Sequence, residues 1–376
     1  KCKGCEYHNT AHPDLKSGFH ECMAVSLGTR FDPVAPTIFD IWNFRKSPAL
    51  MEQGVFSLQE LQALPDYDSY LNDRQRMQVD LTLADEKAEV IAPELRNEMN
   101  SWDFPLHFID FETSMVALPF TSGRKPYEQT AFQFSAHTLH QDGRMEHHEW
   151  IDTNQGVFPN YEFVKQLKAV LDKDEGTIFR YAAHENTVLR QIQTQMLADD
   201  EPEYAELIEW IDTITEWKDG STKIASPRNM VDMLQLVRDY YYHPDMGGSN
   251  SIKKVLPAVM TGDSIKKKYS KPLGFGSHLK GRVLYELDPE SGKPVNPYYL
   301  LPSQYGDLDL SQDELLFEDA EIQQGGAALI AYAKMQFTDM SDIEREALRK
   351  ALLQYCELDT LAMVMIYEHW KKMLNQ

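Results

Sequence analysis

Two carboxylates stand two residues apart in the segment LHFIDFET, residues 106–113. The alternation of apolar residues predicts a β-strand, and positions i and i+2 of a strand point to the same face. Asp110 and Glu112 are therefore expected side by side, with Phe108 on their face. Neighbouring carboxylates raise each other's pKa unless solvent or a cation compensates their charge. The segment fits either a solvated edge strand or one half of a divalent metal site.

Two later segments hold acids that could complete such a site. Glu185 in IFRYAAHENTVLRQI is expected to open a helix after a strand, where it either faces the edge of the sheet or only favours the helix dipole. Tyr355 and Asp359 in YCELDTLAMV are four residues apart and share one helix face, which is either a site or a solvated surface. A two-metal phosphodiesterase needs about four carboxylates, and Mg²⁺ and Mn²⁺ prefer such oxygen ligands.

The order of these motifs resembles the DEDD exonuclease superfamily, whose fold is RNase H-like, and Tyr355 is similar to the tyrosine of one of its subgroups. Between the second and third motifs, Asp232 and the segment Ser251-Ile252-Lys253 match further family positions. Asp232 is the alternative third acid. The second motif departs from the family, which usually has Asp where this chain has the longer Glu185.

The resemblance implies a 3′–5′ exonuclease that hydrolyses DNA or RNA to nucleoside 5′-monophosphates. It places two Mg²⁺ or Mn²⁺ ions on Asp110, Glu112, Glu185 and Asp359, and it gives Tyr355 the role of orienting the attacking water. Two alternatives stay open. One is a catalytically inactive nucleic-acid-binding or scaffold module of the same fold, and the other is a metal enzyme that acts on a small phosphodiester.

The first 22 residues gather Cys2, Cys5 and Cys22, with His8, His12 and His20 among them. The Cys-x-x-Cys spacing predicts either Zn²⁺ completed by His8 or His20, or a [4Fe–4S] cluster that needs a fourth cysteine; three ordinary free thiols are the alternative. The segment resembles the C-terminal cysteine cluster of RecB-like PD-(D/E)XK nucleases. The whole chain resembles a bacterial family that joins both parts, which implies an upstream nuclease module carrying the first cysteine.

Charge and composition limit the classes of partner that the chain can have. The 376 residues have a net charge of −22, which argues against a surface that grips nucleic acid everywhere. Residues 253–282, however, hold eight basic residues and one acid. They predict either a track for single-stranded DNA or RNA, aided by Tyr269 and Phe275, or a solvated loop. Four cysteines make no disulfide scaffold and no apolar run could span a membrane, so a cytoplasmic protein is expected.

The elements that must position these residues indicate an α/β fold. We expect a strand at 106–113, a hairpin over 127–151 turning at Asp142-Gly143, a helix at 160–173, a strand at 176–183 and a helix from 185. This order predicts an RNase H-like mixed β-sheet flanked by helices, after an N-terminal Cys-rich helical segment. Ser57 and Ser341 are expected helix caps. The expected division is a Cys-rich metal segment at 1–30, a helical connector at 31–100 and the exonuclease domain at 101–376.

Overall fold

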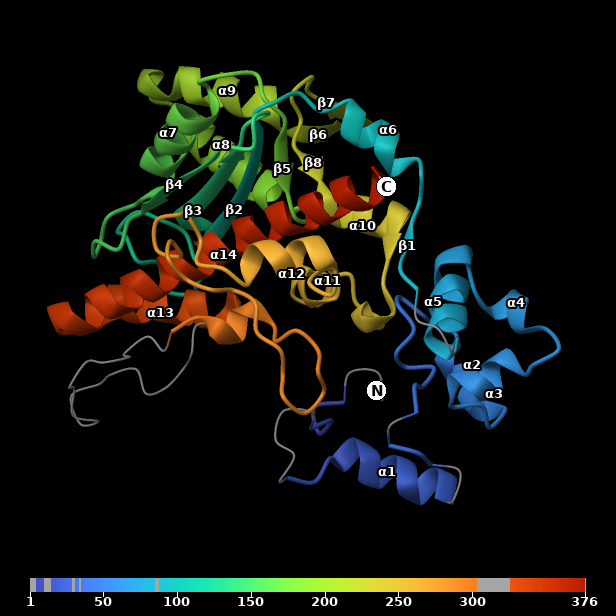
Figure 1. Ribbon diagram of the computed structural model, residues 1–376. Helices are drawn as coiled ribbons and strands as arrows, with labels where there is room; N and C mark the ends of the chain where they lie inside the picture. The colour runs from blue at the N-terminus through green and yellow to red at the C-terminus, as the bar shows by residue number, and fades with distance from the viewer. Residues whose placement is uncertain are drawn as a thin grey trace. The chain divides into compact units, whose positions relative to one another are not determined.

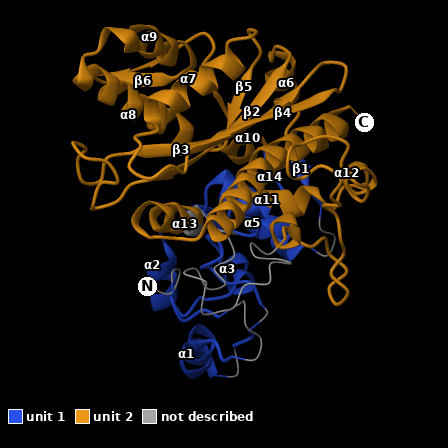
Figure 2. Ribbon diagram, turned by 90° about the vertical axis from the view of Figure 1, so that its left-hand side faces the viewer, with its two compact units in different colours: residues 1–90, 241–254 blue, residues 91–240, 255–376 orange. Residues whose placement is uncertain are grey.

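The computed structural model describes residues 5–9, 15–28, 31–33, 35–84, 88–302 and 325–375, the first three of the last range by their backbone only. The chain forms two compact units. Figure 2 colours them separately: unit 1 comprises residues 1–90 and 241–254, and unit 2 comprises residues 91–240 and 255–376. Among the described residues, no helix has both the length and the apolar character needed to cross a membrane.

Unit 1 is built from short helices, and three of its α-helices begin at a side-chain cap, on Ser17, Ser57 and Asn72. Its elements are α1 (Gly18–Leu27), α2 (Ser47–Glu52), α3 (Leu58–Gln62), α4 (Tyr67–Tyr70), α5 (Asp73–Leu83), β1 (Val90–Ile91), β9 (Tyr241–Tyr242) and η4 (Pro244–Met246). The predicted capping box at Ser57 is confirmed, because its side chain accepts from the backbone of Glu60, whose own side chain accepts from the backbone of Ser57. Ile38, Ile41, Leu58, Leu61 and Val79 form a small core.

Unit 2 is built on a five-stranded mixed sheet in the order β4-β3-β2-β5-β8. Its strands are β2 (Leu106–Ser114), β3 (Thr130–Leu139), β4 (Met145–Ile151), β5 (Ile178–Arg180) and β8 (Val231–Asp232). The pairs β2–β3 and β3–β4 are antiparallel, whereas β2–β5 and β5–β8 are parallel. The predicted hairpin is confirmed as β3 and β4, with Gly143 at a φ of 88° in its turn. The expectation of a mixed sheet flanked by helices is therefore confirmed.

One face of this sheet carries the apolar core. Ile109 and Phe111 of β2 pack with buried side chains of α7 (Asn160–Leu171), α8 (His184–Asp199) and α9 (Ala205–Ile214). Figure 1 shows these helices together on one side of the sheet. Because side chains alternate along a strand, Phe108, Asp110 and Glu112 must face the other side.

The opposite face is covered by α14 (Asp342–Leu374), a continuous helix of 33 residues that crosses β2, β3 and β4 (Figure 1). Ser341 caps its start, as predicted. Gln133 of β3 donates a hydrogen bond to the carbonyl of Leu352, and Phe108 lies against Tyr367. The remaining elements are α6 (Leu95–Asn100), η3 (Pro202–Tyr204), β6 (Glu216–Asp219), β7 (Thr222–Ala225), α10 (Met233–Tyr240), α11 (Ile252–Val259), α12 (Asp263–Tyr269), η5 (Pro297–Leu300) and α13 (Gly325–Phe337).

Candidate functional site

Three of the predicted acids converge between β2 and α14. Asp110, Glu112 and Asp359 each offer a carboxylate oxygen, and these oxygens lie within 4.8 Å of one another. Asp110 and Glu112 reach this point because they alternate with the core residues of β2, and Asp359 because α14 lies across that strand. Glu112 and Asp359 are buried, whereas Asp110 is half-buried. Carboxylates brought together across roughly 250 residues of sequence form a strong candidate for a cation site.

Glu185, the predicted third acid, stands in the first turn of α8 directly after β5. It is only 1% exposed, and its Oε2 has no hydrogen-bond partner among the described residues. The preceding turn is strained, because Ala182 has a φ of 79°, in the left-handed region that favours glycine. The alternative acid, Asp232, is engaged elsewhere: it pairs with Arg180 at 3.3 Å and accepts from the amide of Ala182 at 3.0 Å.

Electrostatics link Glu185 to the other acids. Burial raises the pKa of Asp110 well above its usual range, and the charges of Asp359 and Glu185 raise it further. Burial also raises the pKa of Glu185 to about 8, although Arg180 opposes the shift. Such mutual repulsion means that all these carboxylates can be ionised together only if positive charge is supplied.

Two tyrosines and a cysteine surround the acids. Tyr355 is buried, and burial followed by the charge of Asp359 raises its pKa, so its hydroxyl stays protonated near neutral pH. Tyr298 of η5 donates a hydrogen bond to Oδ1 of Asp359. Sγ of Cys356 lies 3.4 Å from Oδ2 of Asp110, so this thiol packs beside the acids. Tyr298 was not predicted from the sequence, because it comes from a Pro- and Gly-rich stretch without a recognisable period.

The cysteine-rich start is only partly described. Cys5 is half-buried, Cys22 is exposed, and Cys2 and His12 lie outside the described residues. His8 and His20 approach each other with a ring-centroid distance of 5.2 Å. The predicted Zn²⁺ or [4Fe–4S] centre and its upstream nuclease module stay predictions.

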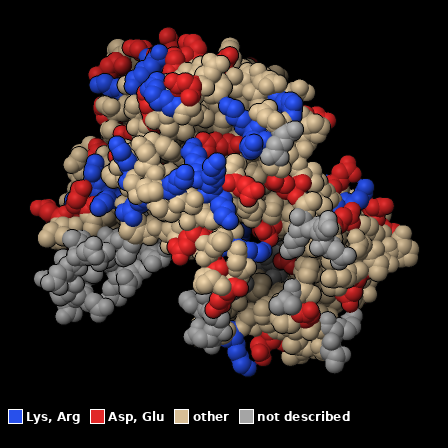
Figure 3. Space-filling view, viewed as in Figure 1, with Lys and Arg blue, Asp and Glu red and all other residues tan. Residues whose placement is uncertain are grey.

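Part of the basic segment lines a groove in unit 2. Lys267, Lys268, Lys271, Phe275 and Lys372 line a cavity of about 690 Å³ beside α12 and the end of α14. Figure 3 shows Lys and Arg side chains gathered over α12. The predicted stacking role of Tyr269 is wrong, because this ring is fully buried and its hydroxyl donates to Glu368. Phe275 is half-buried and borders the groove.

Comparison with known proteins gives one match. The model of a family described as Domain of unknown function (DUF2779) matches residues 107–251. The matched range holds Asp110, Glu112 and Glu185 and ends before α14. No curated protein and no solved structure matches the chain.

Proposed function

We propose that the chain is a two-metal-ion 3′–5′ exonuclease that hydrolyses single-stranded DNA or RNA to nucleoside 5′-monophosphates. The observation that carries this proposal is the convergence of Asp110, Glu112 and Asp359, with the electrostatically linked Glu185, at one end of a mixed sheet. The sheet order, with a hairpin on one side of β2 and parallel strands on the other, supports an RNase H-like fold.

The donor set fits Mg²⁺ or Mn²⁺. All four side chains are carboxylates, and hard divalent cations prefer oxygen ligands. Oε2 of Glu185 is buried without a hydrogen-bond partner among the described residues, and a bound cation would satisfy it. When bound, two such ions would lower the pKa of the attacking water and stabilise the leaving 3′-oxygen.

The chain's own side chains position the reaction. Asp110, Glu112, Glu185 and Asp359 would hold the ions, and the hydrogen bond from Tyr298 fixes the orientation of Asp359. The hydroxyl of Tyr355, protonated and on the same helix face as Asp359, orients the water that attacks the phosphorus. Water attacks the phosphorus directly, so the bond to the 3′-oxygen is broken without a covalent intermediate on any of these side chains.

The basic groove is the proposed contact for the strand outside the cluster of acids, none of which lines it. Lys372 lies thirteen residues beyond Asp359 on the same helix, roughly 20 Å at the rise of an α-helix. Lysines bind phosphates in any sequence and Phe275 offers a ring for base stacking, which together favour a single strand read without sequence preference.

The test incubates the purified chain and Mn²⁺ with single-stranded DNA and RNA oligonucleotides labelled at the 5′ end. We expect a ladder of labelled products that shorten from the 3′ end, and loss of activity by about 100-fold or more in Asp110→Asn and Asp359→Asn. Glu209→Gln, an exposed acid of α9, is the matched control and should retain activity.

Two results would decide against the proposal. If the folded chain cleaves neither polymer and Mn²⁺ does not stabilise it against heat, the inactive scaffold replaces the enzyme. If it cleaves a dinucleotide but no oligomer, the site acts on small phosphodiesters.

A further inference from the structure

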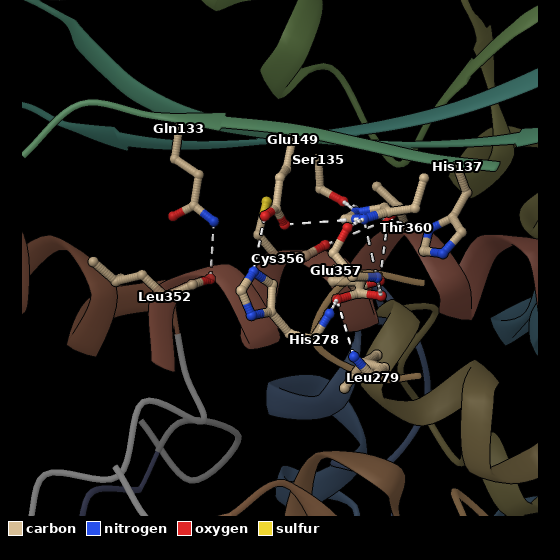
Figure 4. A network of polar contacts seen from close by, with 12 residues as sticks. Gln133, Ser135, His137, Glu149, His278, Leu279, Leu352, Cys356, Glu357 and Thr360 are labelled. Carbon is tan, nitrogen blue, oxygen red and sulfur yellow. Dashed lines mark hydrogen bonds and ion pairs between the residues drawn. The ribbon is translucent and has the colours of Figure 1, made fainter. Parts of the chain in front are cut away.

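A second polar cluster lies under α14, beside the carboxylates. His137 of β3, His147 of β4 and Glu357 of α14 each offer a ligand atom, and these atoms lie within 4.8 Å of one another. All three side chains are buried. Figure 4 shows the surrounding network, which runs from the β3–β4 hairpin to the helix and to the loop that holds His278. The exonuclease proposal gives this cluster no role.

Hydroxyl groups fix the proton positions on the two rings. Thr360 donates its hydroxyl hydrogen to the carbonyl of Glu357 at 3.0 Å, so it can only accept at 2.7 Å from Nδ1 of His137. Ser135, 2.8 Å from Thr360, then donates to Thr360 and accepts from Nε2 of His147 at 2.9 Å. In this arrangement the lone pairs lie on Nε2 of His137 and Nδ1 of His147. The hydroxyl of Ser277, 2.7 Å from Nδ1 of His147, donates to the second of them, and a bound ion would displace that hydrogen bond.

The first of these lone pairs has no partner. Nε2 of His137 is buried and makes no hydrogen bond with any described residue. Nδ1 of His147 lies 3.9 Å from Oε1 of Glu357 and 3.9 Å from Oε2 of Glu149. Oε2 of Glu149 is itself buried and lacks a hydrogen-bond partner there. The cluster therefore holds one imidazole nitrogen, on His137, and one carboxylate oxygen, on Glu149, that are buried without a hydrogen-bond partner among the described residues. Buried polar atoms left in this way are the pattern expected of a site built for a cation.

The carboxylate of Glu357 is held in a fixed position. It accepts hydrogen bonds from the amides of Ser277, His278 and Leu279 at 2.9, 2.7 and 3.2 Å. A Cβ at Gly276 would lie 2.3 Å from Oε1, so the loop wraps closely around this group. Ligands of structural metal sites are oriented in this way by hydrogen bonds from a surrounding shell.

We propose that His137, His147 and Glu357 bind a structural divalent transition-metal ion, Zn²⁺ in the first place, with Glu149 as the fourth ligand. Imidazole and carboxylate ligands in a closed tetrahedral set suit Zn²⁺. Tetrahedral bonds of about 2.1 Å place ligand atoms about 3.4 Å apart. The two 3.9 Å separations from His147 therefore need to shorten by about 0.5 Å, and the other ligand atoms, within 4.8 Å of one another, by up to about 1.4 Å. The ion ties the β3–β4 hairpin to the helix that carries Tyr355 and Asp359, and it does not depend on the nuclease proposal.

The test measures bound metal in the full chain with Cys2, Cys5 and Cys22 replaced by Ser, which removes competing thiolates. After loading with Zn²⁺ and exhaustive dialysis, we expect one equivalent of zinc by elemental analysis. His147→Gln and Glu357→Gln should each lose that equivalent. His148→Gln, the same substitution one residue along β4, should keep it, and Asp110→Asn should keep it also, which separates this site from the carboxylates.

Cobalt gives a second measurement that requires no variant. Co²⁺ in place of zinc should show the visible absorption of a tetrahedral ion without the intense thiolate band. The proposal is overturned if the cysteine-substituted chain retains no zinc and shows no tetrahedral Co²⁺ spectrum, or if folded His147→Gln retains the full equivalent.

Discussion

The hydroxyl of Tyr298 donates a hydrogen bond to the carboxylate of Asp359, although 61 residues separate the two in the chain. Both side chains are buried. The bond fixes the rotation of the Asp359 carboxylate, one oxygen of which lies within 4.8 Å of the oxygens of Asp110 and Glu112. Outer hydrogen bonds commonly orient metal ligands in this way.

Removing that hydroxyl should weaken metal binding. Tyr298→Phe is expected to lower Mn²⁺ affinity by roughly 10- to 100-fold, the usual effect of losing an outer-shell partner, measured by calorimetric titration. Tyr269→Phe is the matched control, since it deletes a buried tyrosine–carboxylate bond to Glu368 on the same helix. Equal Mn²⁺ affinity in Tyr298→Phe and the unchanged chain would show that Tyr298 does not support the metal site.

The second tyrosine should act on rate instead. Tyr355→Phe is expected to reduce kcat by about 100-fold, because a group that orients the attacking water contributes at the chemical step. The Mn²⁺ affinity and the KM for the oligonucleotide should stay close to those of the unchanged chain. A fall in metal affinity that matches the fall in kcat would instead make Tyr355 part of the metal shell.

The buried acids predict how the stability of the metal-free chain depends on pH. The pKa of Glu185 is raised to about 8 in the folded chain, which therefore holds a proton that the unfolded chain has already released. The contribution of this proton to the free energy of unfolding is complete below pH 4 and is lost as the pH rises to 8. The loss is about 1.4 kcal/mol per pH unit for one carboxyl.

Thermal unfolding between pH 6.5 and 8 is the measurement. Histidines also titrate at the acidic end of this window, so the difference in slope between the unchanged chain and Glu185→Gln, rather than the slope alone, reports this carboxyl. Glu185→Gln should flatten the slope, and saturating Mn²⁺ should reverse it. A slope that Glu185→Gln leaves unchanged would assign the effect to other groups.

Charge reversal in the groove should separate binding from chemistry. Lys267→Glu with Lys271→Glu is expected to raise KM for an oligonucleotide and to reduce its salt dependence by about 0.7 in log–log slope per lost phosphate contact. Hydrolysis of the p-nitrophenyl ester of thymidine 5′-monophosphate should not change. Lys218→Glu, an exposed lysine of β6, is the control, and an equal effect from it would mean that net charge alone is responsible.

Gly276 should be intolerant of a side chain. Its φ of 98° disfavours any other residue, and an added Cβ would lie 2.3 Å from the carboxylate of Glu357. Gly276→Ala is expected to cost roughly 1–3 kcal/mol in urea unfolding. Gly274→Ala, where a Cβ meets nothing within 4 Å, should change stability by much less. Similar losses in both would show that the loop does not hold Glu357.

Local patterns predicted the elements that carry the acids. The alternation in LHFIDFET gave β2 and the shared face of Asp110 and Glu112, and the Asp142-Gly143 turn gave the β3–β4 hairpin. That turn also sets the register that pairs His137 with His147, a signal from which the second cluster could have been found. Tyr298 and Glu357 were not predictable in this way, because their partners are set by tertiary packing rather than by periodicity.

Residues of both clusters lie on α14, which is one uninterrupted helix, so their directions around the helix axis are fixed relative to each other. Cys356 and Asp359 face β2, whereas Glu357 and Thr360 lie against His137 and His147 of the β3–β4 hairpin. One residue inserted just before Tyr355 would rotate the preceding part of α14 by about 100° relative to these ligands. An insertion of four residues would nearly restore the rotation but would shift that part of the helix by about 6 Å along its axis. Changes of length in this protein should therefore be tolerated in its loops and rejected within this helix.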